Sequence, residues 1–475
     1  MPSAREQPFK GAWVRELRRG GVSFLAACLL LTPAMGGGAG REAGEGLQEP
    51  PPRQDFSSPD DQLSQFIGSL LVDHPLLRSA QARWRSSLGR VAQEGSLEDP
   101  ELAYNWYAQT PETRVGPQEQ SLELSQRIPW FGKRRLQAQR AARLAESLAW
   151  RVQDIGRNLV AQLKHEYFDA AFLQKALSIN QEETELLRRF EEIALTRYAT
   201  GEGIQQSVVK VQTDISRLRD QKTSLKELLK AKIRRVAQLI GRPDAELALA
   251  PISLHLPELQ YDAGKLEDQA LLDHPRIQEM HQVVQADEVW SRRRILESRP
   301  DFRFGIGYTD VGRRQDTLGI LSPPEENGRD SLALTVGLNL PLYRRRIRAG
   351  VTEAQESARA NQERLQDAVD QLRYEIQEAV LRLESLHDRA RLYKDILIPQ
   401  AGESLGSAEA AYTTDRQDFL DLLDAERILF QVRLTYHRLL SDYWIALADL
   451  ERGLGSRFPS TIPREEEEPP EGSEE

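Results

Sequence analysis

The sequence predicts an α+β membrane protein. Four strands per chain would contribute to a shared transmembrane β-barrel, and a long coiled-coil α-helical barrel would continue from it. Three observations indicate this fold. Residues 331–340 alternate strictly between apolar side chains and small or polar ones, residues 133–200 contain no proline and a single glycine, and the triplet Asp-His-Pro occurs at both 73 and 273. Each triplet precedes a helical stretch, two strand candidates and two long helical runs, so we expect two tandem repeats.

The N-terminal region has the layout of a secretory signal peptide. The apolar run 22–31 is too short to span a bilayer as a helix, and it follows Arg15, Arg18 and Arg19 and precedes small residues. We therefore assign residues 1–40 to a signal peptide. The chain as a whole is 29% charged, which is too polar for a bundle of transmembrane helices.

Cys28, the only cysteine, lies inside this apolar run. The sequence Leu-Ala-Ala-Cys resembles a lipoprotein box, which would make Cys28 a lipidated first residue. The alternative is an ordinary signal cysteine that is removed, and we favour it because the apolar run continues through Leu31.

The rest of the chain divides around the two repeats. We expect a disordered linker at 41–59, a first repeat at 60–240, a second linker at 241–260, a second repeat at 261–455 and a disordered acidic tail at 456–475. The expected strands are 101–110, 120–129, 301–311 and 330–341, and the expected long helices are 133–199, 203–240, 344–413 and 417–454.

The strand candidates have the length and alternation of membrane-spanning strands. Such a strand has ~9–11 residues with one apolar side. An amphipathic hairpin on a soluble core is the alternative, but two hairpins that each lead into a long helix favour the barrel. Four strands cannot close a barrel, and open edges are not tolerated in hydrocarbon, so the barrel must be shared between copies of the chain.

The second long helical run carries a heptad seam. Pro399 interrupts this run and should kink it. Apolar residues at alternating spacings of four and three predict coiled-coil packing: Leu365, Val369, Leu372, Ile376, Ala379, Leu383, Leu386, Ala390 and Tyr393.

Each strand-to-helix junction combines proline, aromatic residues and a basic triplet. The first is Ile128–Arg135 and the second is Leu340–Arg346. Aromatic side chains are typical of membrane–water interfaces, and the basic residues would then lie near lipid headgroups. We expect these membrane-interface anchors: Trp130, Phe131, Lys133, Arg134, Arg135, Tyr343, Arg344 and Arg345.

The run Ile128–Arg135, together with the order and spacing of the two repeats over residues 60–455, resembles TolC-like outer-membrane efflux proteins. It is most similar to the heavy-metal (cobalt-zinc-cadmium type) resistance branch. The resemblance implies a homotrimer in the cell outer membrane with its helical barrel in the periplasm. It also implies a periplasmic adaptor (membrane fusion) protein, an inner-membrane resistance-nodulation-division pump, and passive export of metal cations or small toxic compounds.

The resemblance also assigns residues at the helical turns. The family's Arg-Tyr-x-x-Gly motif matches Arg197, Tyr198 and Gly201, which would meet the adaptor, and the second repeat departs from it around Tyr412. Acidic residues beside the second turn resemble the family's carboxylate-rich gate, although some will be solvated helix positions: Asp415, Asp418, Asp421 and Asp424.

Two other classes of protein fit the sequence less well. An enzyme is not expected, because the seven histidines lack zinc-binding spacing and no Gly-rich phosphate loop or nucleophile elbow occurs, so we expect neither cofactor nor metal. A net charge of −10 without a basic stripe argues against nucleic acid. A soluble periplasmic coiled-coil scaffold or adaptor is the alternative that the long helices alone would allow. In that case the two hairpins would face solvent rather than lipid.

Overall fold

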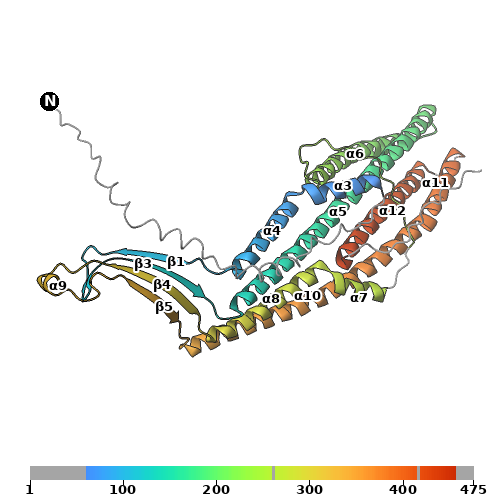
Figure 1. Ribbon diagram of the computed structural model, residues 1–475. Helices are drawn as coiled ribbons and strands as arrows, with labels where there is room; N and C mark the ends of the chain where they lie inside the picture. Colours follow the sequence, from blue (N-terminus) through green and yellow to red (C-terminus); the bar gives the residue numbers. More distant parts are fainter. Residues whose placement is uncertain (1–59, 259–262, 415–417, 456–475) are drawn as a thin grey trace, which may run out of the picture. The chain divides into compact units, whose positions relative to one another are not determined.

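The computed structural model describes residues 60–258, 263–414 and 418–455. Long helices pack side by side, and one antiparallel sheet extends from the end where α5 and α10 begin (Figure 1). The signal peptide 1–40, the linker 41–59, the tail 456–475, Cys28 and Asp415 lie outside the described residues. The domain boundaries given above remain predictions.

The two Asp-His-Pro triplets form the same local structure. Helix α3 (Asp61–Asp73) ends before His74, and α4 (Pro75–Gly95) begins after it. Similarly, α7 (Ala263–Asp273) precedes His274 and α8 (Pro275–Ile295) follows it. The backbone angles are φ −66°, ψ 123° at His74 and φ −65°, ψ 124° at His274. Each imidazole Nδ1 accepts a hydrogen bond of 3.2 Å from the backbone N–H two residues later, so both histidines cap helices.

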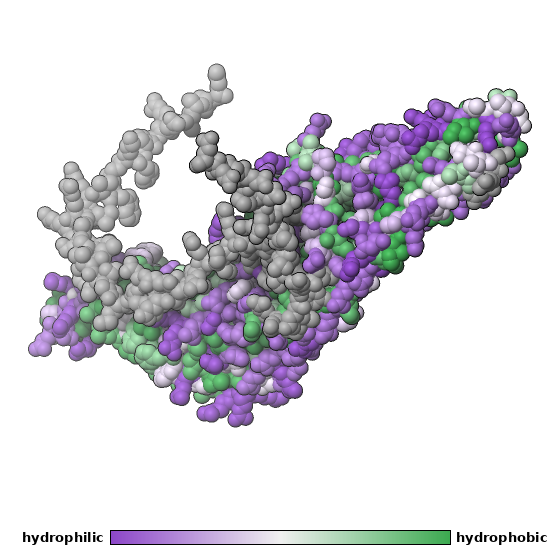
Figure 2. Space-filling model, turned by 90° about the vertical axis from the view of Figure 1, so that its right-hand side faces the viewer, coloured by the Kyte–Doolittle hydropathy of each residue, from purple (hydrophilic) through white to green (hydrophobic). Residues whose placement is uncertain are grey.

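The first pair of long helices is α5 (Lys133–Thr200) and α6 (Gln205–Leu239). Helix α5 has 68 residues, which corresponds to a length of ~100 Å. It packs against α4, α6, α8 and α12 (Figure 1). Figure 2 shows that the helical arm facing the viewer exposes hydrophobic patches among mostly hydrophilic residues.

The second long run is divided into three pieces. Helix α10 (Arg344–Leu392) leads into a π-helical turn, Tyr393–Leu397, and α11 (Ile398–Thr413) follows. Pro399 lacks the N–H that would bond one turn back, and the irregular turn lies where that bond would form. The interruption expected at Pro399 therefore takes the form of a π turn before the proline. Helix α12 (Phe419–Leu454) returns along the bundle.

The predicted heptad seam packs as expected. All nine seam residues, from Leu365 to Tyr393, are buried or partly buried in the main hydrophobic cluster. Helix α10 packs against α7, α8 and α12, and the same cluster also includes Leu63 of α3, Tyr167 of α5 and Trp444 of α12. A second cluster forms where α5, α6, α11 and α12 meet, further from the sheet.

The linker 241–258 packs on the bundle, which its proline content did not indicate. Five of its apolar side chains lie against the main cluster: Leu247, Leu249, Ile252, Leu254 and Leu256. The side chain of Gln174 also bonds the backbone of Ala250 and Ile252 at 3.2 Å and 3.1 Å.

The sheet has the strand order β1-β3-β4-β5, with every pair antiparallel. Its strands are β1 (Glu101–Trp106), β3 (Gly116–Ile128), β4 (Phe302–Val311) and β5 (Ser331–Leu338), and the short β2 (Glu112–Thr113) pairs with β3. β1 and β5 end several residues before the predicted limits, and β3 begins earlier. The elements that were not predicted include β2, the helices α3 and α7, the single helical turn α9 (Thr317–Leu321) in the β4–β5 connection and a 3₁₀ turn, η1 (Leu296–Ser298).

Candidate membrane face, junction and helical end

Strand register aligns the apolar residues of the sheet into rows. One row runs from Leu102 through Leu124 and Ile306 to Leu334. The next contains Tyr104, Leu122, Tyr308 and Leu332. Directly paired residues project to the same side of a sheet, so these rows form one face. Its side chains are exposed in the single chain, up to 80% for Leu334.

The opposite face of the sheet carries small and polar residues. Ala103, Glu123, Gly307 and Ala333 are aligned across the four strands. β1 and β5 are the edge strands, and their outer backbone groups are directed away from the sheet. A sheet with one apolar face, one polar face and two unpaired edges is suited to pairing with further strands at a lipid boundary.

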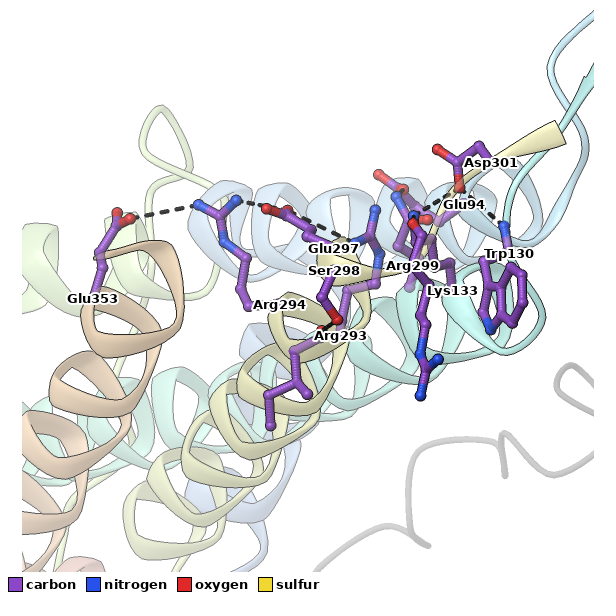
Figure 3. Close-up of polar contacts among 12 residues, drawn as sticks. Glu94, Trp130, Lys133, Arg293, Arg294, Glu297, Ser298, Arg299, Asp301 and Glu353 are labelled. Atoms are coloured by element: carbon purple, nitrogen blue, oxygen red, sulfur yellow. Dashed lines mark hydrogen bonds and ion pairs between the residues drawn. The ribbon is translucent and has the colours of Figure 1, made fainter. Parts of the chain in front are cut away.

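Asp301 connects the strands to the start of α5 (Figure 3). Its carboxylate accepts hydrogen bonds from Lys133 Nζ at 2.7 Å, the Trp130 backbone N–H at 2.9 Å and Arg127 at 3.1 Å. The backbone oxygen of Asp301 accepts from the Asn339 N–H at 3.2 Å, just beyond β5. One residue therefore holds β3, α5, β4 and the end of β5 together.

Burial alone would raise the pKa of Asp301, but its hydrogen bonds from Lys133 and Trp130 and the charge of Lys133 hold that pKa below its ordinary value. Lys133 is only 4% exposed and also donates to the Arg299 carbonyl oxygen at 2.9 Å. The expectation that Lys133 faces lipid headgroups is therefore wrong. The helix dipole disfavours a positive charge at the start of a helix. Lysine is tolerated at this position because its ammonium group donates a hydrogen bond to the Asp301 carboxylate.

The other expected anchors differ in their exposure. Phe131 and Tyr343 are strongly exposed, as are Arg135, Arg344 and Arg345, while Arg134 and Trp130 are partly buried. The Trp130 ring stacks on Phe302 at 5.7 Å between centroids. Gly132 has φ +86°, a conformation that glycine adopts without strain and that permits the turn from strand to helix.

Arginine side chains from α5 and from the last turn of α8 form a layer beside the junction. The guanidinium groups of Arg140 and Arg294 lie over the ring of Trp290, with their central carbons 4.4 Å and 4.9 Å from its centroid. Arg294 also bonds Glu297 at 2.8 Å and Glu353 of α10 at 3.4 Å (Figure 3). These pairs fix α8 against α10 next to the sheet.

The two helical turns meet at the end of the bundle away from the sheet. The Arg197 guanidinium lies 4.6 Å from the centre of the Tyr412 ring, so the predicted tip residues of the two repeats are in contact. Tyr412 is only 6% exposed and packs against Phe419, which removes it from the adaptor-contacting residues. Tyr198 is exposed, and Gly201 ends α5 with φ +80°.

The described acidic residues near this end have separate roles. Asp418 caps α12 by accepting from the Phe419 N–H at 2.7 Å. Asp421 is exposed in the first turn of α12, and Asp424 pairs with Arg427. The acidic gate remains a prediction for Asp418, Asp421 and Asp424.

Glu183 and Glu426 are two acidic residues that the sequence did not single out. They lie on α5 and α12, next in sequence to or one turn from members of the second apolar cluster; Glu426 is buried and Glu183 is partly buried. Burial and nearby acidic groups raise the pKa of Glu183 to about 7 and that of Glu426 to about 8. In the sequence, Glu426 lies next to Ala425 on a side of the helix that is otherwise apolar. This interruption of the apolar pattern was the signal that could have identified it as a buried acid.

None of the helices in the described part of the chain is both long enough and apolar enough to cross a membrane. Within residues 60–258, 263–414 and 418–455, no three His, Cys, Asp or Glu side chains are grouped so as to hold a metal ion.

With the fold and the two strand-to-helix junctions described, the chain can be compared with known proteins. Residues 266–456 match the family described as Outer membrane efflux protein. The resemblance to TolC-like outer-membrane efflux proteins is confirmed, and this class consists of channel proteins rather than enzymes.

Among individual relatives, the chain is 20% identical over 380 residues to the cobalt-zinc-cadmium resistance protein CzcC of Cupriavidus metallidurans, covering 80% of this chain and 86% of that protein. Its fold is similar to CusC (TM-score 0.72, 17% identity, 86% of this chain and 97% of that one). The fold is also similar to the outer-membrane channel OprN (TM-score 0.70, 18% identity, covering 87% of this chain and 95% of that one). It resembles the outer membrane protein VceC of Vibrio cholerae as well (TM-score 0.69, 19% identity, covering 84% of this chain and 97% of that one).

Proposed function

We propose that this protein is the outer-membrane exit duct of a tripartite efflux system. It would passively export metal cations or small toxic compounds from the periplasm to the exterior. The main observation that supports this proposal is the apolar face that is aligned across β1, β3, β4 and β5. Asp301 connects this sheet to the start of α5. Such a face is unfavourable in water at about 25 cal/mol per Å² of apolar surface, and lipid removes that cost.

The sheet edges support an oligomer. Membrane barrels known to close from one sheet have at least about eight strands, and unpaired edges are not tolerated in hydrocarbon. β1 and β5 would therefore pair with the edges of other copies. The family resemblance implies that three copies form the barrel. The matched geometry at His74 and His274 supports an origin by tandem duplication.

The junction would lie at the periplasmic rim of the membrane. Phe131 and Tyr343 would be anchored at the interface, and Arg135, Arg344 and Arg345 would meet phosphate headgroups, with Trp130 and Arg134 contributing their exposed parts. The helical end with Arg197, Tyr198 and Gly201 would meet a periplasmic adaptor, through which an inner-membrane pump supplies the energy. Similarity to a protein named for cobalt, zinc and cadmium resistance supports metal cations as substrates.

The proposal is tested by purifying the full chain from outer membranes and measuring its oligomer mass and its conductance in planar bilayers. We expect a trimer that forms stable conducting channels. A water-soluble protein that fails to insert would instead support the scaffold alternative. Substrate class is tested by expressing the chain, with its pump and adaptor, in cells that lack an exit duct. Restored growth on cobalt, zinc or cadmium would support metal export, and growth restored only on organic toxins would exclude it.

A further inference from the structure

Glu426 is a buried carboxyl group that makes no ion pair with any described residue of the helical end. Its side chain is 3% exposed, and its Oε1 has no hydrogen-bond partner among the described residues. Leu422 and Phe430, one turn away on either side of α12, are buried in the same apolar cluster. An isolated carboxylate is costly in such surroundings, so the group requires either a neutralising ligand or a proton.

The charged groups that act on Glu426 do not neutralise it. From α5, Glu183 adds a like charge, and from α6, Asp214 adds another. Asp214 is itself paired with Lys210 at 3.5 Å and Arg217 at 3.1 Å on the surface of α6. In the described part of the chain, the cation that favours ionised Glu426 is Arg427 on the same helix, which pairs with Asp424. α11 contributes Leu405, Ala408 and Tyr412 to the cluster.

A small cavity beside Glu183 contains a second unpaired oxygen. Its volume is about 160 Å³, and it is lined by Asn180 and Glu183 of α5, Gln221 of α6, and Arg427 and Phe430 of α12, among others. Asn180 donates its amide N–H to the Leu218 carbonyl oxygen at 3.1 Å. Its Oδ1 is buried and, within the described part of the chain, has no donor. An acceptor in this position is complementary to the O–H of a protonated carboxyl group or to a bound water.

We propose that Glu426 and Glu183 form a buried proton-binding site whose occupancy controls how α12 packs against α5 and α6. With a proton bound, Glu426 is a neutral acid that the apolar cluster accommodates. Without it, a carboxylate is left beside Glu183 and Asp214, and like-charge repulsion separates the helices. This inference concerns helix packing and does not depend on the channel function.

The direction of the pH effect follows from the two pKa values. Each acid binds its proton more tightly in the folded chain, where the pKa of Glu426 is about 8 and that of Glu183 about 7, than at the ordinary pKa of 4.5. Stability is therefore highest at or below that ordinary pKa. It decreases as the pH rises towards the folded pKa values, and it changes no further above them. The loosened region includes the cluster that holds Tyr412 and Phe419 at the helical end.

The test compares three forms of the full-length protein in detergent: wild type, Glu426→Gln and Glu185→Gln. The neutral amide introduced by Glu426→Gln would imitate the protonated acid. Glu185 is exposed on α5 close to Glu183 and serves as the matched control. We expect the melting temperature of wild type to fall between about pH 5 and pH 8, the fall to be reduced by at least about half in Glu426→Gln, and Glu185→Gln to follow wild type. If Glu426→Gln does not fold, Glu183→Gln undergoes the same measurement.

An infrared measurement detects the proton directly. At neutral pH, wild type should show the carbonyl absorption of protonated carboxylic acids, and this absorption should be clearly weaker in Glu426→Gln, where only Glu183 of the two acids remains. An undiminished pH dependence in Glu426→Gln, or no such absorption in wild type, would overturn the proposal. A melting temperature that rises with added sodium or potassium ions, while that absorption is missing, would assign the site to a metal cation instead and would also refute it.

Discussion

Lys133 Nζ lies 2.7 Å from the carboxylate of Asp301, although the two residues are 168 positions apart in the sequence. The pair connects the first residue of α5 to the residue that precedes β4, and so it joins the strand-to-helix junction of one predicted repeat to the strands of the other. Replacing Asp301 with Ala would leave a buried ammonium without its partner. We expect a loss of roughly 3–5 kcal/mol in the free energy of unfolding.

Denaturant unfolding of the full chain measures this loss. Asp99→Ala is the control, because Asp99 is an exposed acid shortly before β1. If Asp301→Ala and Asp99→Ala unfold at the same denaturant concentration, the pair does not stabilise the junction.

The same pair predicts an acid-sensitive junction. The pKa of Asp301 is held below its ordinary value of 3.8, despite the opposing effect of burial. Its stabilising contribution is therefore present above that value and is lost as the pH falls through the lower folded pKa. In Lys133→Met the pKa should return towards its ordinary value, so the acid-induced loss of stability should become smaller. Unfolding curves between about pH 5 and pH 2 compare the two proteins, and parallel curves would contradict this role.

Local sequence patterns predicted the helices and strands of this chain better than they predicted which side chains contact one another. Alternation at 331–340 indicated β5, and the heptad from Leu365 to Tyr393 indicated a packed helix, because both signals depend on nearby residues. The burial of Lys133 and Tyr412 was missed because their partners, Asp301 and Arg197, are distant in sequence. Glu426 was missed for a similar reason: its surroundings are formed by α5, α6 and α11 as well as by its own helix.

The apolar face of the sheet gives a sharp substitution test. Val336 is 67% exposed on this face, and its neighbour Thr335 projects to the opposite side. Val336→Arg should block membrane assembly, because an arginine facing the middle of the bilayer costs ~2–4 kcal/mol per chain. Thr335→Arg should assemble far better. Heat-modifiable oligomers on gels distinguish the two, and normal oligomers of Val336→Arg would count against a lipid-facing sheet.

Two tyrosines at the helical end are expected to have different roles: Tyr198 in binding the adaptor and Tyr412 in packing the helices. Tyr198 is exposed, so Tyr198→Ala should weaken binding to the adaptor while leaving the melting temperature almost unchanged. Tyr412 is buried between Arg197 and Phe419, so Tyr412→Ala should cost roughly 3–5 kcal/mol of stability. Co-purification with the adaptor and thermal unfolding measure the two effects. A Tyr198→Ala protein that binds the adaptor normally would remove Tyr198 from that surface.

The proposed acidic gate predicts unequal effects for two of its described members, Asp421 and Asp424, near the start of α12. Asp424 is paired with Arg427, so its charge is already partly balanced, whereas Asp421 is exposed in the first turn. If these carboxylates line the constriction, Asp421→Asn should reduce cation selectivity more than Asp424→Asn, because a ring of unbalanced acidic charges attracts cations. Reversal potentials in a salt gradient across planar bilayers measure selectivity, with the exposed Glu185→Gln on α5 as the control. Unchanged reversal potentials in Asp421→Asn, at the same conductance as wild type, would exclude Asp421 from the gate.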